Sequence, residues 1–284
     1  MPLHPRRLAV ATLACLIPIA GTGCSNQATT TPDEDTAAQP VGHVHGLGTD
    51  PGDGTLYVAS HYGVFRVADG SVTRVAERWQ DTMAFTVIGP GHFLASGHPD
   101  MREDLPVHLD LIESTDGAET WTPVSLEGEA DFHALEATPE VLYGYDSASG
   151  SLLVTDDRQS WRILTKQPTS DLAADPTEPD HLLFTTPNGA LMSLRRGAEP
   201  QQLNAPRLLF IDWPTPDLLV GVAPDGQVYA SHDQADSRQS AGKLAGQVEA
   251  LDVTADRWHV ATSHGVFASN DGGGTWVAVL DHQP

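Results

Sequence analysis

The chain has 284 residues, with 15 basic and 38 acidic side chains, a formal net charge of −23 and an apolar content of 40%. A surface this acidic repels nucleic acid and anionic lipid headgroups, so the composition excludes nucleic-acid binding. It attracts cations or basic partners, although an acidic surface also serves solubility alone.

Residues 1–23 have the pattern of an export signal. Arg6 and Arg7 precede an apolar run from Leu8 to Ala20, which is short for a membrane span. A small-residue sequence, Gly-Thr-Gly, then leads to Cys24, as in a bacterial lipobox. We therefore expect residues 1–23 to be a signal peptide and Cys24 to be acylated, so that the protein is anchored to the lipid bilayer on the outer side of the cell membrane. Gly21 stands where lipoproteins usually carry Leu, so cleavage without lipidation stays an alternative.

Residues 24–40 form the predicted linker. The segment is polar, has no periodicity and contains no large apolar residue, so it cannot contribute to a core. The other cysteine, Cys15, lies inside the predicted signal peptide, and the mature chain would therefore have no disulfide. The folded domain is expected to span residues 41–284.

A turn sequence of the form Ser-x-Asp-x-Gly-x-Thr-Trp, the Asp-box, recurs in the folded part. Residues 269–276 match it at every fixed position, and residues 114–121 differ only by Ala118 in place of Gly. Residues 154–161 keep an Asp and the Trp, and another copy begins at Ser231 without the Trp. Trp121 and Trp161 are about 40 residues apart, and Trp276 lies about three such intervals further along. One interval is the length of a propeller blade.

This spacing predicts an all-β fold, a β-propeller of six four-stranded blades. The blades are expected to begin near Val41, Gln80, Glu127, Gln167, Ala205 and Gly246. In each box, the Asp and Ser side chains should bond the backbone of a tight turn, Gly should permit positive φ, and the Trp should pack between neighbouring sheets. An apolar segment also recurs as the second strand of every blade, at residues 55–60, 92–96, 141–144, 181–185, 218–221 and 258–262.

The axial face is the usual ligand face of a propeller, and the start of each first strand and the turn after each second strand should open on it. His43 and His45 alternate along one predicted strand, so their side chains should point to the same side. The insertion after the second strand of blade 2, residues 97–108, should lie near the axial opening. The candidate ligand-binding residues on this face are His43, His45, His61, His98, Asp100, Arg102, Asp131, His133 and Asp146.

Histidines concentrate on this face, which suggests a metal site. Neutral imidazoles with carboxylates nearby suit Zn²⁺ or Cu²⁺. The candidate metal ligands are His43, His45, His61, His98 and His133. The alternative is that these histidines hydrogen-bond strand ends around the axis, without a metal.

Residues 41–284 resemble the bacterial Asp-box (BNR-repeat) sialidase-like and glycosyl-hydrolase-like β-propeller lipoproteins. The resemblance rests on the boxes at 114–121, 154–161 and 269–276, on His-Val-His-Gly-Leu-Gly at 43–48 and on Gly-His-Pro-Asp at 97–100. It implies the propeller fold and allows glycoside hydrolysis. Sialidases need three arginines around the substrate carboxylate, however, and only Arg102 falls on the predicted face. Another glycosidase would need two flanking carboxylates, one of them protonated.

Three functions from different classes therefore stay open. The leading expectation is a non-catalytic propeller that binds a ligand, glycan or protein at the cell envelope through its axial face. The second is a propeller that binds Zn²⁺ or Cu²⁺ through the histidines. The third is a sialidase-like glycoside hydrolase.

Overall fold

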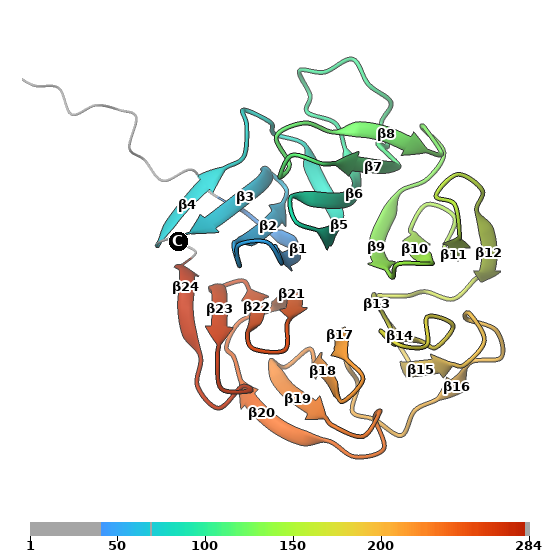
Figure 1. The fold of residues 1–284 in the computed structure, drawn as a ribbon, viewed down its shortest axis with the longest axis vertical. Coiled ribbons are helices and arrows are strands. Elements are labelled where there is room, and N and C mark those ends of the chain that lie inside the picture. Colours follow the sequence, from blue (N-terminus) through green and yellow to red (C-terminus); the bar gives the residue numbers. More distant parts are fainter. Residues whose placement is uncertain (1–40, 69, 282–284) are drawn as a thin grey trace, which may run out of the picture. The chain divides into compact units, whose positions relative to one another are not determined.

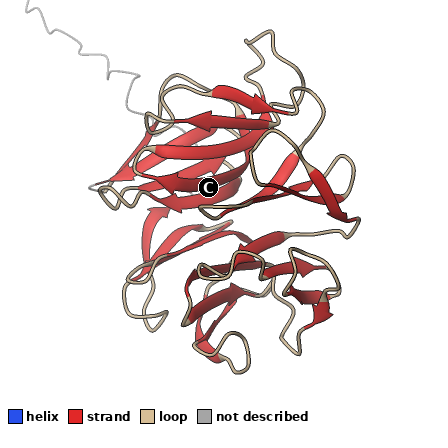
Figure 2. Cartoon of the chain, turned by 45° about the vertical axis from the view of Figure 1, so that its right-hand side comes forward, coloured by secondary structure: helices blue, strands red, loops and turns tan. Residues whose placement is uncertain are grey.

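Every regular element among the described residues is a β-strand (Figure 2). The computed structural model describes residues 41–68 and 70–281. The predicted signal peptide 1–23 and the linker 24–40 with Cys24 lie outside these residues. Within the described part of the chain, no helix is long and apolar enough to cross a membrane.

The first three blades follow one another along the chain. Blade 1 consists of β1 (Val44–Thr49), β2 (Leu56–Ser60), β3 (Gly63–Ala68) and β4 (Ser71–Arg74). Blade 2 consists of β5 (Asp81–Gly89), β6 (His92–His98), β7 (Leu111–Ser114) and β8 (Thr122–Ser125). Blade 3 consists of β9 (Phe132–Ala137), β10 (Leu142–Asp146), β11 (Ser151–Thr155) and β12 (Arg162–Thr165).

The other three blades complete the propeller. Blade 4 consists of β13 (Asp171–Ala174), β14 (Leu182–Thr186), β15 (Gly189–Ser193) and β16 (Gln201–Gln202). Blade 5 consists of β17 (Phe210–Thr215), β18 (Leu218–Val222), β19 (Gln227–Ser231) and β20 (Gln239–Lys243). Blade 6 consists of β21 (Val248–Val253), β22 (Trp258–Thr262), β23 (Gly265–Ser269) and β24 (Val277–Asp281).

Each blade is an antiparallel meander whose strands are in sequence order. The first strand of each blade lies nearest the centre of the ring and the fourth lies at the rim (Figure 1). The predicted second strands are confirmed, since β2, β14, β18 and β22 are buried along their whole length. The expected fold, an all-β propeller of six four-stranded blades, is confirmed.

The hydrophobic core is divided between the blades. Each of the six buried apolar clusters contains residues of two neighbouring blades. The box tryptophans join the cluster shared with the preceding blade: Trp121 packs with blade 1, Trp161 with blade 2 and Trp276 with blade 5. Because these clusters lie between sheets, each blade depends on its neighbours for its buried surface.

The box turns contain the predicted hydrogen bonds. In the last turn, the Ser269 hydroxyl donates to Asp271 Oδ1 at 2.8 Å, and Asp271 accepts from the backbone N–H and hydroxyl of Thr275, both at 2.8 Å. Gly272 and Gly273 have φ values of +69° and +84°. A Cβ at Gly273 would lie 2.2 Å from the carbonyl oxygen of Ala241, so only glycine fits there without movement of the backbone.

The box alignment in blade 3 is wrong by one residue. Asp157, not Asp156, accepts the backbone N–H of Ser160 at 2.7 Å, and Thr155, not Val154, supplies the hydroxyl at 3.0 Å. This turn is one residue shorter, and Arg158 alone has a positive φ, of +59°. Asp156 instead forms an ion pair with Arg196 of blade 4 at 2.5 Å.

Side chains of the inner strands, of the residue after β1 and of β6 link each blade to the next one around the axis. Carboxylates of blades 3 to 6 accept backbone N–H groups of the following blade: Glu136 from Ala174 at 3.0 Å, Asp171 from Ile211 at 2.8 Å, Asp212 from Val253 at 2.7 Å and Asp252 from Thr49 at 3.2 Å. Asp50 of blade 1 accepts the N–H of Gly91 in blade 2 at 2.8 Å, and Ser96 of blade 2 accepts that of Phe132 in blade 3 at 3.2 Å.

Trp276 provides a test of packing between blades. Its indole is partly buried against the cluster shared by blades 5 and 6, and its N–H donates to the carbonyl of Ala241 at 3.3 Å. We expect Trp276→Ala to lower the free energy of unfolding by about 3 kcal/mol, because it leaves a cavity between two sheets. Trp276→Phe keeps most of the apolar area, so it should lower the free energy of unfolding by clearly less. Denaturant unfolding measures both.

Val277→Ala is the matched control, because Val277 is adjacent but 67% exposed. If all three variants were equally stable, the indole would not contribute to packing between blades 5 and 6.

Candidate functional site

Several of the inner strands contain a β-bulge near their start, at the end of the propeller where the histidines lie. The pairing registers place the extra residue at His45 in β1, Met83 in β5, His133 in β9 and Glu249 in β21. A bulge turns the side chain of its extra residue away from the regular alternation. Since β1 begins at Val44, His43 precedes the strand, and the alternation expected for His43 and His45 does not determine where these side chains lie.

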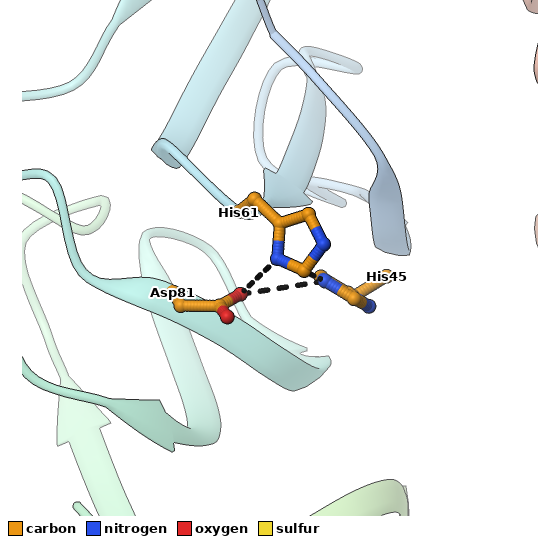
Figure 3. A group of neighbouring side chains, drawn as sticks. All are labelled: His45, His61 and Asp81. Carbon is orange, nitrogen blue, oxygen red and sulfur yellow. Dashed lines mark hydrogen bonds and ion pairs between the residues drawn. The ribbon is translucent and has the colours of Figure 1, made fainter.

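Three side chains from blades 1 and 2 meet at the axial end (Figure 3). His45 Nε2 lies 3.1 Å from His61 Nδ1 and 3.3 Å from Asp81 Oδ1, and His61 Nδ1 lies 2.9 Å from Asp81 Oδ1. We call His45, His61 and Asp81 the blade 1–2 cluster. Although Oδ1 of Asp81 lies this close to both rings, it has no hydrogen bond of acceptable geometry among the described residues. The three atoms therefore converge on a common point.

The environment favours the metal-binding forms of these groups. Burial lowers the pKa of His45 from 6.5, and this effect exceeds the opposing effect of the Asp81 carboxylate. Burial alone would raise the pKa of Asp81, but the imidazoles of His45 and His61 lower it below its usual value. At neutral pH the cluster thus offers a neutral imidazole beside an ionised carboxylate, which is the state that coordinates a divalent transition metal.

His43 lies beside this cluster but is fastened to blade 6. Its Nδ1 lies 2.9 Å from Glu249 Oε1, and Glu249 Oε2 accepts the backbone N–H of Val44 at 3.0 Å. The centroid of the His43 ring lies 4.9 Å from the ring centroid of His45 and 5.6 Å from that of His61. Glu249, which was not among the predicted site residues, therefore holds the start of blade 1 against blade 6.

A second group of side chains lies at the boundary of blades 2 and 3. Asp131 Oδ1 is 3.9 Å from His98 Nε2 and 3.8 Å from His108 Nδ1. We call His98, His108 and Asp131 the blade 2–3 cluster. His133 lies beside it and donates from Nε2 to the other oxygen of Asp131 at 3.0 Å.

The structure thus places the five predicted metal ligands in two groups. It brings His45 and His61 together with Asp81, and His98 together with His108 and Asp131. His43 and His133 flank these clusters, each bound to a carboxylate. Asp81 and His108 belong to the expected face but were not among the candidate ligands, and their neighbours in space could not be found from sequence spacing.

The other candidate residues hold loops in place. Arg102 donates from Nε to both carboxylate oxygens of Asp100, at 2.9 and 3.0 Å, and Asp100 also accepts the N–H of Trp79 at 3.2 Å. The Arg102 guanidinium, despite the opposing effect of burial, holds the pKa of Asp100 well below its usual range. Asp146 accepts the backbone N–H of Asp131 at 3.0 Å and that of Ala148 at 3.1 Å. Asp146 therefore fixes the backbone of Asp131.

An axial cavity of about 570 Å³ lies inside the ring of inner strands. His45 and His133 line it together with Glu136, Asp171, Asp212 and Asp252, and the described residues that line it include no lysine or arginine. Burial raises the pKa of Glu136 to about 8 and that of Asp171 to about 7, and burial together with Asp252 raises that of Asp212 well above its usual value. This cavity cannot supply the three arginines that sialidase chemistry requires.

No protein-family model and no curated protein sequence matches this chain. Its fold is similar to that of a chain in the crystal structure of the nidogen/laminin complex, with a TM-score of 0.63 and 11% identity over 81% of this chain and 93% of that chain. It is also similar to YCF48 bound to D1 peptide, with a TM-score of 0.51 and 12% identity over 76% and 74% of the two chains. An ancestral GH74 enzyme has a TM-score of 0.52 and 16% identity over 86% of this chain and 39% of that chain. At such identities the likeness shows the propeller fold alone, a fold compatible with ligand or protein binding.

The axial carboxyls predict how stability depends on pH. The raised pKa values mean that Glu136 and Asp171 keep their protons in the folded protein at pH values where they ionise in the unfolded chain. Their contribution to stability is therefore complete below about pH 4 and is lost as the pH rises through about 7 to 8. We expect the free energy of unfolding to fall between about pH 5.5 and about pH 8.5, as measured by urea unfolding.

Asp171→Asn, which cannot ionise but can still accept the N–H of Ile211, should reduce this fall. Asp225→Asn is the control, since the hydrogen bond from Lys243 lowers the pKa of Asp225 and moves its titration below this range. If the free energy of unfolding fell equally with pH in Asp171→Asn and in the unaltered protein, the expectation would be contradicted.

Proposed function

We propose that this protein is an extracytoplasmic, lipid-anchored β-propeller that binds a divalent transition metal ion, Zn²⁺ or Cu²⁺, at its axial face. The observation that carries the proposal is the blade 1–2 cluster, in which two imidazole nitrogens and one carboxylate oxygen lie 2.9 to 3.3 Å from one another.

These separations suit metal ligands. Nitrogen and oxygen ligands lie about 2.0 to 2.2 Å from Zn²⁺, so neighbouring ligands of a tetrahedral site are about 3.3 to 3.6 Å apart. Two imidazoles and a carboxylate form a donor set that Zn²⁺ accepts, with a further position left for water or another ligand. The net charge of −23 adds a long-range attraction for cations.

The arrangement favours metal binding over the two other functions considered. A glycoside hydrolase would need a protonated acid and a second carboxylate free to act on a substrate. The axial carboxyls with raised pKa values are instead engaged, since Glu136, Asp171 and Asp212 each accept a backbone N–H from the next blade. Binding of a glycan or protein is compatible with the fold, but no group of side chains in residues 41–68 and 70–281 points to one such partner.

The location at the cell envelope is supported by the sequence alone. Arg6, Arg7, the apolar run to Ala20 and Cys24 are arranged as in a lipoprotein signal. Acylation of Cys24 would anchor the protein to the outer side of the cell membrane, and a polar linker at residues 25–40 would connect it to the propeller. There the protein would meet Zn²⁺ and Cu²⁺ from outside the cell.

The metal site is tested by titrating the purified full-length protein with Zn²⁺ and, separately, with Cu²⁺ in a calorimeter. We expect Asp81→Asn and His45→Ala each to weaken binding at this site by on the order of tenfold or more, because each removes a ligand. His232→Ala is the matched control, since His232 lies outside both clusters and donates to the carbonyl of Asp217.

The proposal would be overturned if Asp81→Asn and His45→Ala bound both metals as tightly, and in the same amount, as the unaltered protein. Circular dichroism melting of each variant shows that a loss of binding is not a loss of fold.

A further inference from the structure

The boundary of blades 2 and 3 contains a second convergence of metal-binding groups, built by different elements. His98 is the last residue of β6, His108 ends the insertion that follows it, and Asp131 directly precedes β9. The backbone around Asp131 is fixed from two sides. Asp146 accepts its N–H at 3.0 Å, and the buried Asp110 accepts the backbone N–H groups of residues 128–130.

The carboxylate of Asp131 has one satisfied and one unsatisfied oxygen. Oδ2 accepts hydrogen bonds from His133 Nε2 at 3.0 Å and from the Ser147 hydroxyl at 2.7 Å. Oδ1 is buried and has no hydrogen-bond partner among the described residues, and Asp131 as a whole is only 8% exposed. A buried carboxylate oxygen without a hydrogen-bond partner destabilises the folded protein. This indicates that a ligand binds at Oδ1.

The two histidines point to the same missing ligand. His98 Nδ1 donates to the carbonyl of Val107 at 2.9 Å, which leaves the lone pair of the neutral ring on Nε2, facing Asp131 Oδ1 at 3.9 Å. His108 Nδ1 is also buried, has no hydrogen-bond partner in the described part of the chain, and lies 3.8 Å from the same oxygen. These separations are too long for hydrogen bonds, and the three ligand atoms all lie within 4.8 Å of one another, so a movement of a few tenths of an ångström brings them to the spacing of ligands at about 2.0 to 2.2 Å from one cation.

From this geometry we infer that the protein has a second divalent transition-metal site, in which His98 Nε2, His108 Nδ1 and Asp131 Oδ1 bind the ion. The hydrogen bond from His98 to Val107 sets the ring tautomer, as hydrogen bonds to metal-bound histidines commonly do. His133 and Ser147 are positioning residues that hold the carboxylate through its other oxygen. The inference shares no residue with the blade 1–2 cluster and stands without it.

A metal ion here would also fasten the insertion of blade 2. His98 and His108 are the two ends of the loop 99–107, whereas Asp131 belongs to the start of blade 3, so the ion ties the loop to the next blade. Asp100 is buried and fixes the first part of this loop, but Met101 and Val107 are 101% and 72% exposed, so the rest of the loop has little buried surface. Binding of metal should therefore slow amide hydrogen exchange in the segment 99–109.

The test uses the purified full-length protein with Co²⁺, whose visible absorption reports ligand binding, and with Zn²⁺ in competition. We expect each cluster to take one ion. His108→Ala and Asp131→Asn should lose the ion of the blade 2–3 cluster and the metal-dependent protection of residues 99–109, yet keep the other ion. Asp81→Asn should show the reverse, and His232→Ala should keep both.

The possible results separate the two proposals. If His108→Ala and Asp131→Asn bound as much metal as the unaltered protein, and only Asp81→Asn lost an ion, the second site would be refuted while the proposed function stood. If only the variants of the blade 2–3 cluster lost an ion, the second site would stand and the blade 1–2 site would fail. An unaltered protein that bound no ion would refute both. Because His108 lies in an exposed loop, His108→Ala is expected to fold, which a thermal melt verifies.

Discussion

The bond between one inner strand and the next is the interaction on which the rest of the propeller depends. All four strands of blade 1 come from the start of the domain and all four strands of blade 6 come from its end, so no strand exchange closes the ring. Closure instead depends on side chains: Glu249 accepts the N–H of Val44, and Asp252 accepts both the N–H and the hydroxyl of Thr49. The apolar cluster shared by blades 1 and 6 adds buried area at the same seam.

The same geometry explains why the candidate sites lie between blades and not within one. The starts of the inner strands converge on the axis, and bulges at His45 and Glu249 bring polar side chains into contact with the neighbouring blade. Asp81 and His98, which belong to different clusters, are paired directly opposite each other across β5 and β6. Gly97 permits this close approach, because a Cβ there would lie 1.9 Å from the carbonyl oxygen of Asp81. The two clusters are therefore adjacent, and movement of blade 2 would affect both.

Acidic groups lie in two distinct environments in this molecule. Those of the inner strands are enclosed, hydrogen-bonded to the next blade and, at Glu136 and Asp171, protonated up to near-neutral pH. Asp81, at the start of β5, and Asp131, just before β9, instead face imidazole rings, and one oxygen of each has no hydrogen bond among the described residues. Burial raises the pKa of an isolated carboxyl, whereas nearby donors and cations lower it. The partner of each carboxyl thus separates the two groups: a backbone N–H of the next blade for Glu136 and Asp171, and imidazole rings for Asp81 and Asp131.

The sequence by itself determined the fold class, the number of blades and the approximate start of each, because box turns and buried second strands repeat at a fixed period that local patterns reveal. It also named His45, His61, His98 and Asp131 as candidate site residues. Only the tertiary structure decided that Asp157 rather than Asp156 closes the turn of blade 3, that Asp100 and Arg102 bind each other, and that the histidines divide into two clusters completed by Asp81 and His108. These outcomes depend on bulges, on turn length and on contacts between blades. Such features move a side chain by a few ångströms without changing the periodicity of the sequence.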